Sequence, residues 1–534
     1  MNIAEKMNFR IPNFLHQLYK TKNLVILLFT IALLSRIPGV YIMEMENEPG
    51  RDGAYYYDLA QNIKLGNDEV TSFKDVWYED WKTREGEIQT PSFVAPLFPY
   101  ILSILFHIGD SLLIIRIFNV FLSSLSICLY FSLIKNTFNK EIGLFSAFLV
   151  ISNPTYYYLS VSLLTEPLFI FLSLILFNFI FFNFNSDSKL HVLILSLLSA
   201  LIFLTRISGS LLLISIFCWL LYTKKEYYTP ALYSISTAIM VLPWLINNKV
   251  SHGLYLPFLS ILEVYPTNYP PKIYSGDNAS FFDSLSFLSF LDNFSYLYND
   301  LISVSMLFLL LPFVILSIPH NYRKLNLQLI FFYSIIVILF HMFYGGGFYV
   351  QRYFVLFTIL LIPLGLSELK RYLNYFKDKY NADKVLVSSV FAMFIFGSIY
   401  CPFYLIDNTI SPFYDNNEEK YEWLTDNSNP EDVIVSTEHR HASFFTGLSV
   451  LALPSGMDES QFSEFVEAYD IKFLVLEEIN KDHYRSNELI KDLYYSNEIG
   501  SKKAILDYEF TLVHISYGDK SDIHFFSISR VGNL

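Results

Sequence analysis

Long apolar runs recur along almost the whole sequence, and they constrain the fold more than any other feature. A run of about 20 apolar residues is long enough to cross a hydrocarbon core about 30 Å thick. Only 16% of the 534 residues are charged, whereas a soluble chain carries about 25%. The sequence therefore predicts a polytopic membrane protein and excludes a soluble globular enzyme and a disordered chain. The net charge of −13 also argues against binding to nucleic acid.

Eleven membrane spans are predicted from these runs. The cations before the first span should stay in the cytoplasm by the positive-inside rule, so the first span runs outward and the N-terminus is cytoplasmic. An odd number of spans then places the C-terminus outside the cell membrane. The spans cover residues 23–43, 112–133, 142–160, 167–184, 190–205, 209–223, 229–247, 300–318, 326–343, 353–369 and 385–405.

The apolar segment from Phe93 to Ile108 is shorter than most of these runs and contains Pro96 and Pro99. If it crossed the membrane, every later cluster of cations would face outward, against the positive-inside rule. We therefore expect this segment to lie at the membrane interface or to re-enter from the outer side.

Acidic residues gather in the segments that this topology places outside. Residues 44–92 hold twelve acids against five bases, and residues 406–534 hold 24 acids against ten bases. We therefore predict an α-helical integral membrane domain over residues 1–405, with a large first extracytoplasmic loop at 44–110 that carries interfacial helices. Residues 406–534 should form a small extracytoplasmic α/β domain. A further outer segment, 248–299, is rich in Tyr, Pro, Asn and Phe.

Local patterns in the C-terminal segment support the α/β prediction. Two short apolar runs are typical of strands, a segment with helical spacing lies between them, and two later runs around a turn predict a hairpin. The two strands are Asp432–Ser436 and Lys472–Leu476, and the helix between them is Glu459–Tyr469. The hairpin is formed by Tyr508–Ser516 and Ile523–Val531.

Two acidic residues stand at the outer ends of spans, where an ionisable group costs free energy unless it is paired or used. Asp52 follows the first span in the segment Glu48–Ala60, and Glu166 opens a later span in Leu164–Pro167. Each also has a structural explanation, because Asp commonly caps a helix and Glu complements the helix dipole in a first turn.

Two arginines occupy similar outer turns. Arg206 lies in a tight turn between two apolar runs, and Arg352 follows the glycines of Gly345–Gly347 and opens another span. Both break the inside bias for cations, so each requires an anionic partner. That partner is either a lipid headgroup or the phosphate of a bound lipid substrate, onto which a guanidinium can form two parallel hydrogen bonds.

The four turns together place two carboxylates and two guanidiniums on one face of the membrane. This combination suits group transfer from a phosphate-activated lipid, because phosphate is already a good leaving group. Guanidiniums can stabilise the departing charge, and a carboxylate can take the proton from an attacking hydroxyl.

With these motifs in order, the chain resembles the GT-C superfamily of polytopic glycosyltransferases, in the branch that holds the protein O-mannosyltransferases and the lipid A aminoarabinose transferase. The order and spacing of short motifs over most of the chain carry the resemblance. They are Asp52–Ala60, Pro96–Pro99, Arg116, Asn153–Pro154, Thr165–Pro167, Thr205–Arg206, Pro243–Trp244 with Asn247–Asn248, and Arg352–Tyr353.

The resemblance implies an enzyme that takes a sugar, a hexose or a pentose, from a polyprenyl-phosphate carrier on the extracytoplasmic face. The sugar would pass, with inversion, to a protein, lipid or glycan acceptor. Asp52 matches the family's catalytic aspartate, and Glu166 matches a second acidic position. Arg206 and Arg352 match contacts to the lipid phosphate.

Other site residues follow from the same resemblance. Tyr55 and Asp58 are expected to contact the acceptor or the sugar. Gly53 stands where the protein mannosyltransferases usually carry a Glu after the Asp, Ala95 replaces the first Pro of the Pro-Pro-Leu motif, and Asn247 stands where many relatives have Arg. These departures leave the sugar and the acceptor open.

Two other functions stay open at this stage: a transporter or flippase of lipid-linked glycans, and a non-catalytic scaffold. The sequence shows no internal repeat of the kind common in transporters. The three cysteines lie in apolar runs and predict neither a disulfide nor a metal cluster. His439 and His441 lie beside Glu438 and could bind a divalent cation, although their position in a solvated loop would explain them as well. No other cofactor is implied.

Overall fold

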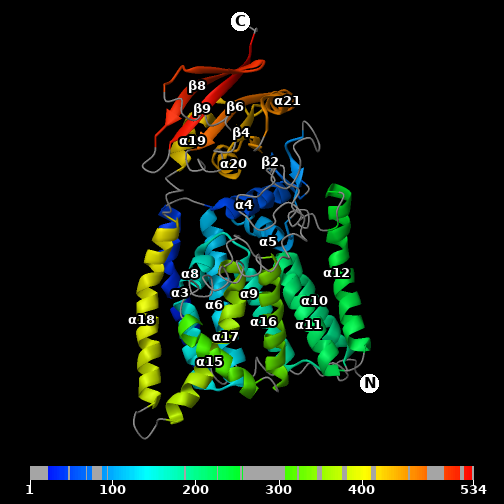
Figure 1. Cartoon of the computed structure of the whole chain (residues 1–534), viewed down its shortest axis with the longest axis vertical. Helices are drawn as coiled ribbons and strands as arrows, with labels where there is room; N and C mark the ends of the chain where they lie inside the picture. The colour runs from blue at the N-terminus through cyan, green and yellow to red at the C-terminus, as the bar shows by residue number, and fades with distance from the viewer. Residues whose placement is uncertain are drawn as a thin grey trace.

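The computed structural model describes residues 22–45, 49–67, 69–74, 87–92, 94–185, 188–224, 227–252, 255, 307–321, 324–344, 351–375, 382–409, 417–454, 457–477, 493, 498–517 and 522–531. A bundle of long helices forms one end of the molecule, and an α/β domain forms the other (Figure 1). Two short helices of the first loop, α4 (Arg51–Lys64) and α5 (Leu97–Leu105), lie between these two parts. The predicted outer segment 248–299 and the triple glycine at 345–347 fall mostly or wholly outside the described residues.

Apolar helices of different lengths build the bundle. They are α3 (Lys22–Met45), α6 (Leu112–Thr137), α7 (Lys140–Ile151), α8 (Pro154–Val161), α9 (Glu166–Phe182), α10 (Lys189–Thr205), α11 (Ser210–Lys224), α12 (Tyr228–His252), α15 (Leu307–Asn321), α16 (Leu325–Tyr344), α17 (Gln351–Tyr375) and α18 (Ala382–Thr409). Among the described residues, four helices are long and apolar enough to cross a membrane, or five if α8 and α9 form one broken span. The count of eleven spans stays a prediction.

The predicted span 142–160 is not one helix, which corrects the sequence interpretation. The chain breaks between α7 and α8, because Pro154 has no N–H to continue the helix and Asn153 caps a new one. The side chain of Asn153 accepts a hydrogen bond from the backbone N–H of Tyr156 at 2.8 Å. A second bend of 112° separates α8 from α9, so the chain turns sharply just before Glu166.

In the described part of the segment that was expected not to cross the membrane, residues 94–108, the helix is α5, which is nine residues long. A helix of this length spans about 14 Å, less than half of the hydrocarbon core. It packs against α4 through the rings of Phe98 and Tyr56, whose centroids lie 5.4 Å apart. This arrangement agrees with a segment that lies at the interface.

The α/β domain is built on a seven-stranded sheet with the order β2-β5-β4-β6-β9-β8-β7. Its strands are β2 (Phe73–Lys74), β4 (Val433–Ser436), β5 (Val450–Ala452), β6 (Ile471–Glu477), β7 (Lys502–Ile505), β8 (Tyr508–Ser516) and β9 (Ile523–Arg530). Strand β2 comes from the first loop and pairs in parallel with β5 at the edge of the sheet. In the same loop, β1 (Val70–Thr71) and β3 (Thr90–Pro91) form a separate antiparallel pair.

Alternating side chains of the central strands fill two cores on the two faces of this sheet. Ile434 packs into the core that contains α19 (Asn417–Asn427) and α20 (His439–Thr446). Val435, the next residue, packs into the core under α21 (Glu459–Tyr469). This period of two is the strand pattern, and the predicted strands, helix and hairpin of this domain are confirmed.

The idea that His439 and His441 lie in a solvated loop is wrong. Both side chains are buried, and they stand in the first turn of α20. The ring of His439 packs edge-on against Phe73 of strand β2, with the centroids 5.5 Å apart. His439 therefore belongs to the contact between the α/β domain and the first loop, whereas His441 contacts Glu438 and Phe445 of its own domain.

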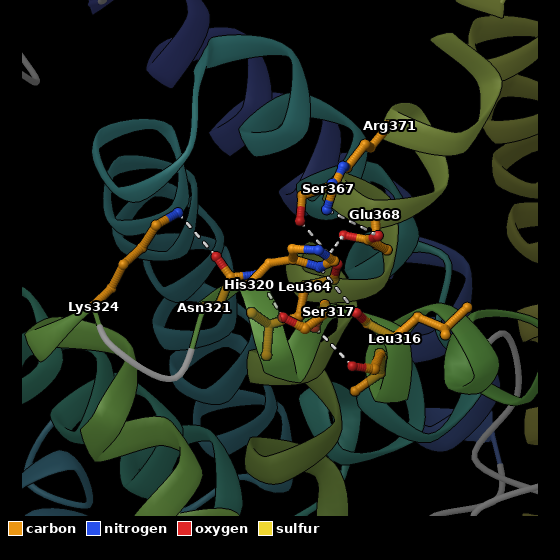
Figure 2. Close-up of polar contacts among 10 residues, drawn as sticks. Leu316, Ser317, His320, Asn321, Lys324, Leu364, Ser367, Glu368 and Arg371 are labelled. Atoms are coloured by element: carbon orange, nitrogen blue, oxygen red, sulfur yellow. Dashed lines mark hydrogen bonds and ion pairs between the residues drawn. The ribbon is translucent and has the colours of Figure 1, made fainter. Parts of the chain in front are cut away.

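A polar cluster closes the bundle at the end away from the α/β domain (Figure 2). Glu368 of α17 is buried, and its two carboxylate oxygens lie 3.6 Å from His320 Nδ1 of α15 and 3.6 Å from Arg371 Nη1. The neighbouring Lys370 forms an ion pair with Glu141 at the start of α7. Cations that the positive-inside rule assigned to the inner face thus gather at this end.

Candidate active site

Two glycines place Asp52 at the start of α4. Gly50 precedes the helix with a φ of 72°, a conformation that side chains with a Cβ rarely adopt. A Cβ on Gly53 would lie 2.9 Å from the Cβ of Leu163, so α4 can rest on the loop after α8 only because this residue is glycine. Glycine at position 53 therefore has a steric reason, and the close approach brings Asp52 near the start of α9.

Glu166 lies in the first turn of α9, directly after the 112° bend. Asn119 of α6 fixes the preceding loop, because its side-chain amide donates to the carbonyl oxygens of Ser162 and Leu164 at 2.7 and 3.2 Å. Only 2% of the Glu166 side chain is exposed. Burial of a carboxylate costs free energy unless cationic or hydrogen-bonding groups lie beside it.

Arg206 reaches that carboxylate from the end of α10. The chain leaves the helix in an extended conformation at Arg206 and forms a short 3-10 turn, η1 (Ile207–Gly209), before α11 begins. A Cβ on Gly209 would lie 2.9 Å from a side-chain carbon of Ile202 and 3.0 Å from its carbonyl oxygen, so the turn needs glycine. The guanidinium donates to Thr165 Oγ1 at 3.1 Å, and its Nη1 lies 2.5 Å from Glu166 Oε1.

Arg352, at the start of α17, connects the two carboxylates. Its Nη2 lies 2.7 Å from Asp52 Oδ2, and its Nε lies 3.6 Å from Glu166 Oε1. The four residues singled out in the sequence therefore form one chain of ion pairs, in the order Asp52, Arg352, Glu166 and Arg206. This chain lies on the side of the bundle that faces the α/β domain.

A fifth charged residue, Arg440, comes from the α/β domain and was missed by the sequence analysis. Its Nη1 lies 3.3 Å from Asp52 Oδ1, and its guanidinium lies over the ring of Tyr55 at 5.2 Å from the centroid. Arg352 contacts the other oxygen of the same carboxylate. Asp52 is thus held between a cation of the bundle and a cation of the C-terminal domain.

These cations control the ionisation of Asp52. Burial would raise the pKa of its carboxyl group, but Arg352 and Arg440 outweigh burial and lower the pKa to about 2. Asp52 therefore carries a negative charge at any physiological pH and is available to accept a proton. Its strength as a base depends on how closely the two guanidiniums approach it.

Tyr55 and Asp58, the other two predicted site residues, lie on α4 beside this network. The ring of Tyr55 is buried under Arg440, and its hydroxyl donates to Ser92 Oγ at 3.3 Å. Asp58 points to the first loop, where it accepts a hydrogen bond from the backbone N–H of Ser72 at 2.8 Å. Their contact with acceptor or sugar stays a prediction, and the described contacts give both a role in fixing the first loop.

Tyr56 is a second residue that the sequence analysis did not single out. Burial and the nearby Asp52 carboxylate raise the pKa of its phenol well above the ordinary value. The phenol therefore stays protonated and can donate a hydrogen bond near Asp52. The row of three tyrosines at residues 55–57 was the available signal, since aromatic residues with a polar tip are frequent in binding sites.

No group of three or more His, Cys, Asp or Glu side chains that could hold a metal ion occurs within the described part of the chain. Asp52 and Glu166, the carboxylates closest to the centre of the network, are both engaged by guanidiniums. The three cysteines are free thiols.

Comparison with known proteins gives one partial family match and several structural matches. Residues 93–246 match the family described as dolichyl-phosphate-mannose-protein mannosyltransferase, which is less than half of the chain. No curated protein matches the sequence.

Solved structures match over most of the chain. ArnT from Cupriavidus metallidurans bound to undecaprenyl phosphate superposes with a TM-score of 0.58 at 11% identity, over 94% of this chain and 98% of that chain. The archaeal oligosaccharyltransferase AglB from Archaeoglobus fulgidus, in complex with an inhibitory peptide and a dolichol-phosphate, gives a TM-score of 0.57 at 13% identity. That match covers 96% of this chain and 75% of that chain. At these identities the likeness establishes the fold, and the predicted GT-C type fold is confirmed.

Proposed function

We propose that this protein is an integral-membrane glycosyltransferase that uses a polyprenyl-phosphate-linked sugar as its donor. The observation that carries the proposal is the chain of ion pairs formed by Asp52, Arg352, Glu166 and Arg206. It gathers groups for proton removal and for phosphate binding at one end of the helical bundle. The partial family match and the fold shared with ArnT and AglB support the same reaction class.

In the proposed reaction, an acceptor oxygen attacks the anomeric carbon on the face opposite the phosphate. The new bond between the acceptor oxygen and the sugar forms as the bond from the anomeric carbon to the phosphate oxygen breaks, so the configuration is inverted. Asp52 takes the acceptor proton, and polyprenyl phosphate leaves with the electron pair of the broken bond. A positioned base of this kind typically contributes about 10²–10⁴-fold to the rate.

Arg206 and Arg352 would hold the donor phosphate. Guanidiniums match the geometry of phosphate oxygens and keep their charge at all relevant pH values. They would stabilise the negative charge that builds up on the departing phosphate. Two of the matched structures contain undecaprenyl phosphate or a dolichol-phosphate, which is the same type of carrier lipid. Glu166 would orient the acceptor or share the role of base with Asp52, and its contacts to Arg206 and Arg352 hold it in place.

The domain arrangement follows from the same proposal. Residues 1–405 would form the catalytic unit, and residues 406–534 would cover its site from the extracytoplasmic side, with the N-terminus in the cytoplasm. The donor sugar would be a hexose or a pentose, and the acceptor a protein, lipid or glycan hydroxyl. Tyr55 and Asp58 would line the acceptor side through the first loop.

Release of the carrier lipid provides the test. The purified protein is reconstituted in liposomes and incubated with radiolabelled polyprenyl-phosphate sugars and a mixture of acceptors. A glycosyltransferase releases free polyprenyl phosphate and labels an acceptor. A flippase moves the label across the bilayer without releasing the carrier, and a scaffold does neither, so each of these two outcomes contradicts the proposal.

A variant of another outer carboxylate serves as the control for this assay. Asp110 is half exposed and forms a surface ion pair with Lys64 at 2.6 Å. Asp110→Asn should release carrier lipid at the wild-type rate, because an exposed pair of this kind adds little to stability and does not touch the network.

A further inference from the structure

The position of Arg440 gives the α/β domain a direct part in the site. Arg440 stands in the first turn of α20, and only 14% of its side chain is exposed. Its guanidinium lies between the Asp52 carboxylate and the face of the Tyr55 ring. A guanidinium stacked on an aromatic ring loses little freedom when it forms further hydrogen bonds. The side chain is therefore held ready at the place where the two domains meet.

Several contacts between the α/β domain and the first loop keep α20 in this position. Strand β2 of the loop pairs with β5, so the loop is part of the domain's own sheet. The buried Lys74 donates to the hydroxyl of Tyr469 at 2.7 Å. On α20 itself, the ring of Phe444 packs edge-on against Tyr57 of α4, with the centroids 5.1 Å apart. These contacts fix Arg440 relative to α4 and hence relative to Asp52.

The five side chains of the network carry a net positive charge. Three guanidiniums and two carboxylates meet in it, which leaves these five side chains with a net charge of +1. The donor of the proposed reaction is a phosphodiester, and a phosphodiester carries one negative charge. Without Arg440 the remaining four side chains would be neutral, and the excess positive charge would be lost.

We propose that Arg440 is a third binding residue for the donor phosphate, supplied to the membrane site by the C-terminal domain. This inference rests on the proposed function and deepens it by assigning the donor site to both parts of the chain. In the structure, Arg352 and Arg440 each contact one oxygen of Asp52, as they would contact two oxygens of a phosphate. Asp52 thus occupies the place of an anion, and the incoming phosphate competes with it for both guanidiniums.

The competition links donor binding to the chemistry. When the phosphate draws Arg352 and Arg440 away, the Asp52 carboxylate loses the cations that weaken it as a base. It then accepts a proton from the acceptor hydroxyl more readily. Without donor, Arg352 and Arg440 stay paired with the Asp52 carboxylate and keep it a weak base. Asp52 therefore becomes an effective base only when the donor is bound.

Kinetics of Arg440 variants test this inference. Arg440→Gln should raise the KM for the polyprenyl-phosphate sugar by about 10- to 150-fold, the range expected for loss of one hydrogen bond to a charged group. Arg440→Lys should recover part of the loss, because it keeps the charge but not the planar fork. The control is Arg530→Gln, which removes an exposed arginine of the same domain that pairs with Glu467 on the surface. Its donor KM should match that of the wild type.

The outcomes separate this inference from the proposed function. If the wild type releases carrier lipid and Arg440→Gln has an unchanged donor KM, the inference is refuted and the proposed function stands. A lower kcat with an unchanged KM also refutes it, because Arg440 would then only position other groups. If the wild type releases no carrier lipid from any donor, the proposed function itself fails. If Arg440→Gln does not fold, inhibition of Arg440→Lys by free polyprenyl phosphate is measured instead. The inference predicts that the lipid inhibits this variant less tightly than it inhibits the wild type. Equal inhibition constants would refute the inference.

Discussion

Replacing Arg352 with Gln removes the residue that joins the two carboxylates of the site. The guanidinium lies 2.7 Å from Asp52 and 3.6 Å from Glu166, and Gln is too short and uncharged to replace it. Glu166 keeps Arg206 at 2.5 Å, and Asp52 keeps Arg440 at 3.3 Å. The variant should therefore fold, but its site loses one positive charge at the proposed position of the phosphate.

The magnitude follows from the hydrogen bond to phosphate that Gln at position 352 cannot form. One hydrogen bond to a charged group contributes about 1.5–3 kcal/mol, which corresponds to a rise in donor KM of about 10- to 150-fold. The side chain is 27% exposed, so solvent screens part of the interaction and favours the lower half of this range. Arg352→Lys should recover only part of the affinity.

The pH dependence gives a second, independent readout of the same change. In the wild type, Arg352 and Arg440 lower the pKa of Asp52 to about 2 against the opposing effect of burial. Without Arg352 the pKa of Asp52 should rise, because one of the cations that oppose the effect of burial is gone. Because the reaction needs the ionised carboxylate, the acid limb of kcat/KM, which reports on the free enzyme, should move to higher pH. The variant should thus lose more activity at pH 4 than at pH 7.

The assay measures release of polyprenyl phosphate from a labelled donor as a function of donor concentration and pH. Arg371→Gln is the matched control, because Arg371 lies at the other end of the same helix and is 59% exposed. An Arg352→Gln variant with a donor KM within about twofold of the control would refute the phosphate assignment. An unchanged acid limb would refute the pairing with Asp52.

Three further variants test the remaining parts of the structure. Asp58→Asn should raise the KM for the acceptor, while the release rate at saturating acceptor stays within about twofold of the wild type, because its oxygen can still accept from Ser72. Burial raises the pKa of Asp58 to about 6, so ionisation of this carboxyl group disfavours the folded state. The thermal stability of the wild type should therefore fall as the pH rises from 4 to 7, and that of Asp58→Asn should fall less. Glu368→Gln should lower stability by about 1 kcal/mol, since its partners are half exposed, and leave release unchanged. Lys74→Met, which removes the bond to Tyr469, should slow release more than Glu368→Gln does if docking of the α/β domain serves the site.

The predicted charged group at the outer face could be found from the sequence because each member marks the end of an apolar run. Helix ends gather at the two faces of a membrane, so Asp52, Glu166, Arg206 and Arg352 had to share one face. Which carboxylate meets which guanidinium depends on helix rotation and on close approaches such as that of Gly53 to Leu163. A one-dimensional pattern does not contain that information.

Arg440 is a site residue that could not be predicted from the sequence. It lies 388 residues from Asp52 in the chain and inside a strongly acidic segment with no apolar run to mark its depth. Its role follows only from the docking of the α/β domain on α4. The division of the predicted span 142–160 had a readable signal in Asn153-Pro154, an N-cap followed by the residue favoured at the first helical position. The sequence stays apolar across this break, so hydropathy alone does not reveal it.

The most direct test of the account is the rate of carrier release by Asp52→Asn at saturating donor. Asn has the same size, and the N-cap of α4 is Gly50, so the expected capping role of Asp52 is wrong and the fold should be retained in the variant. If Asp52 is the base, the rate falls by about 10²–10⁴, while donor affinity stays the same or tightens because the amide no longer competes with the phosphate as an anion. Release by Asp52→Asn at the wild-type rate would contradict the assignment of Asp52 as the base that accepts the acceptor proton.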